Sequence, residues 1–99
     1  MPKACRITDL ITIHECGVIP TALTGSADVF IEGKGAHRQE DSNSSHPAVP
    51  EASGCTPHIT QLTSGSPDIF VNGKPLARVG DSYGCGIELT SGASTVSAN

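Results

Sequence analysis

The sequence nearly repeats itself at an offset of forty residues. Residues 24–42, TGSADVFIEGKGAHRQEDS, align without a gap to residues 64–82, SGSPDIFVNGKPLARVGDS. Repeats of this length are supersecondary units that bury their apolar faces against one another. The chain is therefore constrained to fold as an assembly of similar small units.

The two ends of the chain carry the pieces of a third copy. The segment RITD near the N-terminus matches RVGD at residues 78–81, and SGASTV near the C-terminus matches SGSPDI at residues 64–69. We therefore expect residues 3–9 and 91–97 to form a split third repeat, which makes residues 1–99 a single domain with threefold pseudo-symmetry. Such a domain is suited to a threefold partner.

The composition predicts a thin core that needs a staple. A chain of 99 residues buries only roughly 60–65% of its unfolded surface. This one has no Trp, one Tyr and two Phe. Small domains of this kind commonly depend on disulfides or a metal, and four Cys and four His could supply either.

The charge and the chain start exclude several classes. A formal charge of −4 and six scattered Lys and Arg argue against nucleic acid as a partner. No apolar stretch is long enough to span a bilayer, and because no basic segment followed by a long apolar one is visible, we expect no secretory signal. We expect synthesis in the cytoplasm, where reduced cysteines favour metal binding over disulfides.

The local patterns predict an all-β domain of short hairpins. Apolar residues alternate or form short β-branched runs, and Gly, Pro, Ser, Asn and Asp interrupt them about every ten residues. The clearest hairpin runs from Asp68–Val71 through Asn72-Gly73 to Lys74–Val79, because Asn-Gly tolerates positive φ. In contrast, residues 41–56 are rich in Ser and Pro and lack a period, so we expect a long functional loop there.

One potential metal ligand follows each Arg-x-x-Asp element of the three copies. His14 lies five residues after the first Asp, His46 five after the second, and Cys85 four after the third. Pseudo-symmetry would bring these three side chains towards one axis. Tetrahedral zinc takes a fourth ligand, and His58 is the unmatched candidate. Four protein ligands would make the site structural, with no open position for catalytic water.

The remaining Cys and His residues leave alternatives. Cys16 and Cys55 could replace one ligand, because His14-x-Cys16 and Cys55-x-x-His58 are plausible ligand pairs. Cys5 is expected to be a small buried thiol. His37 replaces the alanine of the other copy and is expected to be exposed.

Two further motifs have structural interpretations. The Gly-Ser pairs at residues 25–26 and 65–66 lack the P-loop spacing and are expected to form turns. Asp9, Asp41 and Asp81 recur in every copy, so we expect each to cap a turn or pair with the Arg three residues earlier.

Taken together, these features resemble the PAAR-repeat proteins, over nearly the whole chain. The most specific stretch is GSPDIFVNGKPLARVGD at residues 65–81. The first copy departs from it at Gly35, His37, Gln39 and Glu40, which leaves the register of its second strand open. The resemblance implies a small cone of β-strands with a zinc ion near its apex. It implies the same ligands: His14, His46, His58 and Cys85.

The resemblance also implies a mechanical role on a contractile injection machine. One chain would cap one trimeric β-helical spike, cover its exposed strand edges and sharpen it for piercing a target membrane. The expected location is the tip of a phage tail spike or of a secreted type VI spike. No enzymatic activity and no small-molecule substrate are expected. The alternative is a small zinc-binding module or zinc enzyme, which would need an open metal position and a nearby base in a pocket.

Overall fold

The structure, a computed structural model, describes residues 1–12, 19–51 and 54–99, with the backbone alone over 46–51 and 54–58. The described residues contain no helix, and their six short strands pair into three antiparallel hairpins. These are β1 (Phe30–Ile31) with β2 (Lys34–Gly35), β3 (His46–Glu51) with β4 (Gly54–His58), and β5 (Phe70–Val71) with β6 (Lys74–Pro75). The expected all-β class is confirmed.

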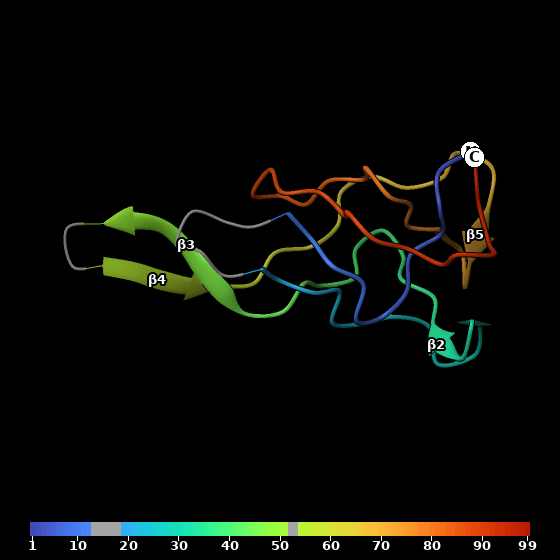
Figure 1. The fold of residues 1–99 in the computed structure, drawn as a ribbon, viewed down its shortest axis with the longest axis horizontal. Coiled ribbons are helices and arrows are strands. Elements are labelled where there is room, and N and C mark those ends of the chain that lie inside the picture. The colour runs from blue at the N-terminus through green and yellow to red at the C-terminus, as the bar shows by residue number, and fades with distance from the viewer. Residues whose placement is uncertain (13–18, 52–53) are drawn as a thin grey trace.

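The molecule is elongated, with principal extents of 43 × 23 × 23 Å. Figure 1 shows that the β3–β4 hairpin forms one narrow end, called the tip below. The strands β2 and β5 and both chain termini lie at the opposite, broader end, called the base. The tip and the base are therefore separate surfaces at opposite ends of the molecule.

The two aligned repeats form hairpins with the same register. Phe30 pairs with Gly35 in the first, and Phe70 with Pro75 in the second. The Asn-Gly hairpin is confirmed, although β5 and β6 are shorter than residues 68–71 and 74–79. Its turn residues have φ values of 54° and 79°, and those of the Glu32-Gly33 turn have 52° and 82°. The register of the first copy is therefore unchanged by its departures in sequence.

The two ends of the chain meet in the same kind of contact. Lys3 pairs antiparallel with Ser97, and the N–H of Ala4 donates to the carbonyl of Val96 at 2.9 Å. The same hydrogen bond joins Ala36 to Val29 and Leu76 to Ile69. At this contact the two chain termini lie where the other two hairpins have their turns.

Three corresponding residues form a closed ring of backbone hydrogen bonds. Cys5 N–H donates to the Ala77 carbonyl at 3.0 Å, Ala77 N–H to the His37 carbonyl at 2.9 Å, and His37 N–H to the Cys5 carbonyl at 3.1 Å. All three residues are fully buried. The ring ties together segments from the N-terminus and from both internal repeats.

The core is built from small and medium-sized side chains in two clusters. One includes residues from the base hairpins and chain ends: Ala4, Ile31, Ala36, Val71, Leu76, Ala93 and Ala98. The other includes Cys5, Ile11, Ala22, Leu62, Ala77, Tyr83, Ile87 and Leu89. Close approach is needed beside them, because a Cβ on Gly65 would lie 2.7 Å from the Pro75 Cβ. The buried state of Cys5 is confirmed.

Each Arg-x-x-Asp element closes on itself, as expected for a structural role. The ion pairs measure 2.8 Å in Arg38–Asp41 and 2.9 Å in Arg78–Asp81. Each Asp also accepts a hydrogen bond from a hydroxyl that opens a repeat: Thr24 to Asp41, Ser64 to Asp81 and Ser91 to Asp9. The three acidic residues are buried and fully engaged in these contacts.

Two expectations are wrong. Residues 41–56 do not form a loop throughout, because most of them belong to β3 and β4. Prolines are compatible with this ribbon. Among the described residues β3 and β4 pair only with each other, and a residue on the outer edge of such a pair needs no N–H donor. The register shift between Pro47 and Pro50 breaks the alternation that a sequence pattern would reveal.

His37 is the second correction, because it is fully buried instead of exposed. Its counterparts in the other copies are the small residues Cys5 and Ala77, which leave room for one large ring. Both ring nitrogens find partners, at 2.6 Å from the Thr24 carbonyl oxygen and 2.7 Å from the Tyr83 hydroxyl. A buried polar side chain is tolerated when its hydrogen bonds are satisfied in this way.

Candidate metal centre and apolar base

Two of the expected ligands face each other in the tip hairpin. His46 at the start of β3 and His58 at the end of β4 are register partners. Directly opposed residues in an antiparallel pair have Cα atoms roughly 4.5–5.5 Å apart. The hairpin thus brings together two histidines that are separated by eleven residues in the sequence.

Cys85 lies in a tight turn that approaches the same place. The N–H of Tyr83 donates to the Ile87 carbonyl, and the N–H of Gly86 donates to the Tyr83 carbonyl, both at 2.9 Å. Gly86 has a φ of 93°, which favours glycine. The Cys85 thiol is free and partly exposed. The turn therefore presents the thiol without burying it.

Thr60 links Cys85 to the tip hairpin. Its hydroxyl oxygen lies 3.3 Å from the Cys85 Sγ, and Thr60 follows His58 by two residues. The end of β4 is therefore next to the turn that carries Cys85. The backbone of His46 and His58 and the side chain of Cys85 therefore lie in the same part of the fold.

The fourth expected ligand, His14, lies outside the described residues, as does the alternative Cys16. The described residues on either side are well anchored. The N–H of Thr12 donates to the Glu88 carbonyl at 2.8 Å, and the N–H of Ser44 donates to the Thr21 carbonyl at 2.7 Å. Thr12 is thus tied to Glu88, three residues after Cys85, and Thr21 to Ser44, two residues before His46.

The alternative Cys55 occupies a different level of the hairpin. It pairs with Pro50, three residues from His58 towards the turn of the tip. At about 3.3 Å per residue this is roughly 10 Å along the strand. Within the residues and side chains that the structure describes, no group of three or more His, Cys, Asp or Glu could hold a metal ion.

The donor set nevertheless fits zinc in its chemistry. Imidazole and thiolate are the ligands that structural zinc sites use. The Cys85 thiol is not consumed by a disulfide and has a hydroxyl within hydrogen-bond distance. If zinc binds, His14, His46, His58 and Cys85 would hold it.

The opposite end of the molecule carries exposed apolar side chains. Phe30 in β1 is 60% exposed and Phe70 in β5 is 56% exposed. Further exposed apolar residues of the same segments are Met1, Val29, Ile69 and Val96. We call these six residues the apolar base. Large side chains left in water at one end of a small domain are typical of an interaction surface.

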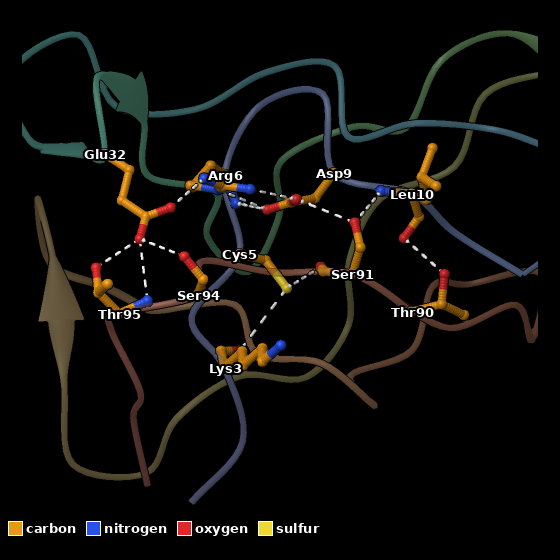
Figure 2. A network of polar contacts seen from close by, with 10 residues as sticks. All are labelled: Lys3, Cys5, Arg6, Asp9, Leu10, Glu32, Thr90, Ser91, Ser94 and Thr95. Carbon is orange, nitrogen blue, oxygen red and sulfur yellow. Dashed lines mark hydrogen bonds and ion pairs between the residues drawn. The ribbon is translucent and has the colours of Figure 1, made fainter.

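A polar network holds the chain ends in place beside this base (Figure 2). The Glu32 carboxylate accepts hydrogen bonds from Arg6 Nη1 at 2.7 Å and from Thr95 N–H at 3.0 Å. Hydrogen bonds from Thr95, together with the charge of Arg6, lower the pKa of Glu32. In the second hairpin, Asn72 occupies the corresponding turn position and accepts from Arg38. The unusual Glu32 of the first turn is thus explained by its partners.

Sequence reasoning missed the buried His37–Tyr83 pair and the buried Asn43. Burial lowers the pKa of His37, so its ring is neutral at neutral pH. Burial also raises the pKa of the Tyr83 hydroxyl. The sequence signal for the burial of His37 was that the corresponding positions of the other copies hold the small residues Cys5 and Ala77.

No pocket was found in the part of the chain that the structure describes. The described residues also contain no helix long and apolar enough to cross a membrane.

Comparison with known proteins supplies the family. A search of curated proteins finds no significant match. The family model for the PAAR motif matches residues 12–91, which is more than half of the chain. The chain therefore belongs to the PAAR-motif family.

Proposed function

We propose that this chain is a structural spike tip that caps a trimeric β-helical spike, one chain per trimer. The PAAR-motif family is a structural family whose members generally sit on a spike protein. The observation that carries the finer proposal is the apolar base, which lies at the end of the molecule opposite the tip hairpin. Two machines carry such spikes, the type VI secretion system and the contractile phage tail, and either would present this tip to a target membrane.

Recurrent contacts around the chain support a threefold match to such a partner. The ring of Cys5, His37 and Ala77 joins three corresponding segments. The pairing of Lys3 with Ser97 repeats that of Phe30 with Gly35. We infer from these recurrences that residues 3–9 and 91–97 complete a third repeat about a pseudo-threefold axis. Three similar segments then face three identical spike chains.

The metal would stabilise the opposite end. A zinc ion held by His14, His46, His58 and Cys85 would supply binding free energy that adds to folding stability. The Cys85 turn and the β3–β4 hairpin come from separate parts of the sequence, and a shared metal would clamp them together. Elemental analysis of the purified protein should find about one zinc per chain.

The spike contact is tested by a binding measurement on matched variants. Phe70→Ser places at the base the residue that the chain itself has at the corresponding Ser97. Loss of a central aromatic anchor should weaken binding to a trimeric β-helical spike fragment by about tenfold or more. Leu23→Ser is the control, because Leu23 is 49% exposed but lies outside the apolar base. Equal binding by the wild type and Phe70→Ser would contradict the proposed surface.

A further inference from the structure

The Cys85 thiol has a hydrogen-bond partner whose own bonding fixes the direction of the proton. Asn43 Oδ1 accepts from the Thr60 N–H at 2.9 Å. This contact identifies the other end of the Asn43 amide as the NH₂ group, which can only donate. That group lies 2.7 Å from the Thr60 hydroxyl oxygen. The hydroxyl therefore accepts from Asn43 and keeps its own proton for another acceptor.

The sulfur of Cys85 is that acceptor, at 3.3 Å from the Thr60 oxygen. A metal-bound cysteine is a thiolate, which accepts hydrogen bonds and has none to donate. Asn43 donates to the Thr60 hydroxyl, and that hydroxyl donates to the Cys85 sulfur. This direction suits a thiolate, which is the form of cysteine that binds a metal.

The donors are held firmly in the fold. Asn43 is fully buried, and its N–H also donates to the Thr60 carbonyl at 3.0 Å. It forms a bridge with Ala22 on its other side. Three hydrogen bonds, one between the two backbones and two that use the Asn43 side chain, therefore fix Thr60 relative to Asn43. Little freedom is left for the Thr60 hydroxyl to move away from Cys85.

The arrangement occurs in one of the three copies. By their backbone hydrogen bonds, the counterparts of Asn43 are Ile11 and Tyr83, and those of Thr60 are Pro20 and Ile87. Neither of these other pairs can repeat a relay from an amide to a threonine hydroxyl. Among the three copies, the pair of an amide and a threonine hydroxyl therefore occurs in the one that contacts Cys85.

We propose that Asn43 and Thr60 form a hydrogen-bond relay that positions the Cys85 thiolate for metal binding, with Thr60 as the positioning residue. The inference rests on the proposed metal centre. Hydrogen bonds to a metal ligand orient it and tune the metal, and their removal typically weakens metal binding by about 10- to 100-fold.

The test compares Thr60→Val, which keeps the shape and removes the hydroxyl, with two matched variants. Thr60→Ser retains the hydroxyl. Thr63→Val removes an exposed hydroxyl that donates to the Ser82 carbonyl and not to Cys85. Zinc affinity is measured by chelator competition on the full chain. Thr60→Val should bind zinc about 10- to 100-fold more weakly, while the other two should bind as the wild type does.

Cobalt provides a readout that a general loss of stability would not move. The thiolate-to-Co(II) charge-transfer band of the wild type should shift in Thr60→Val and stay in place in Thr60→Ser. An unshifted band with unchanged zinc affinity in Thr60→Val would overturn the relay. If Thr60→Val does not fold, Thr60→Ala is measured in the same way.

Failure of the metal centre itself would look different. A wild type that binds no zinc, or a Cys85→Ser variant that binds it with full affinity, would overturn the proposed ligand set and the relay with it. Zinc binding that depends on Cys85 but not on the Thr60 hydroxyl would overturn the relay alone.

Discussion

His37 Nε2 lies 2.7 Å from the Tyr83 hydroxyl oxygen, within the buried interior. The other ring nitrogen faces the Thr24 carbonyl oxygen, which can only accept, so Nδ1 carries the proton. In the neutral ring Nε2 is then an acceptor, and Tyr83 donates to it. Tyr83 also begins the turn that carries Cys85. The pair therefore connects the buried ring of backbone hydrogen bonds to the candidate metal centre.

Acid should destabilise the fold through His37. Burial lowers its pKa below the ordinary 6.5, so below that value the unfolded chain binds a proton that the folded chain excludes. The stability that a neutral His37 contributes is fully present above pH 6.5. It falls as the pH drops below that value, by up to about 1.4 kcal/mol per pH unit.

His37→Gln, which can still donate and accept, should reduce this dependence. Chemical unfolding at about pH 7.5 and about pH 5, with zinc in excess, measures it for both proteins. The two proteins share every other titratable group, so only the difference between them is informative. An identical loss of stability would show that His37 is not the titrating group.

The sequence predicted the features that depend on local chemistry and on the repeat. The Asn72-Gly73 turn and the pairing of Arg38 with Asp41 follow from residues close together in the chain. The hairpin of β3 and β4 was missed, because its prolines and shifted register hide the strand pattern. The burial of His37 was missed as well, because its acceptability depends on Tyr83, forty-six residues away.

The chain ends should be sensitive to crowding at Gly92. A Cβ there would lie 2.8 Å from the Ala4 carbonyl oxygen and 2.9 Å from the Lys3 Cβ. Gly92→Ala should therefore lower the free energy of unfolding by about 1–3 kcal/mol. Gly84→Ala is the matched control, because the nearest atom to its added Cβ would be 4.0 Å away. Thermal denaturation that affects both variants equally would argue against tight closure of the two termini.

Two cysteines separate burial from metal binding as sources of stability. Cys5 is fully buried and Cys85 is partly exposed, so packing alone predicts that Cys5→Ala is the more damaging change. A zinc ligand at Cys85 predicts the reverse order in the zinc-loaded protein. Melting temperatures with zinc, and again after chelation, distinguish the two. If Cys5→Ala remains the worse variant with zinc bound, Cys85 is not a ligand that stabilises the fold.

The proposed capping of a spike is tested by the stoichiometry of the complex with a trimeric β-helical spike fragment. Light scattering after size-exclusion chromatography gives the mass of the complex at low and at high salt. We predict one chain per trimer, in a complex that survives high salt because apolar contacts and backbone pairing hold it together. Three chains per trimer, or dissociation when salt is raised, would contradict the cap.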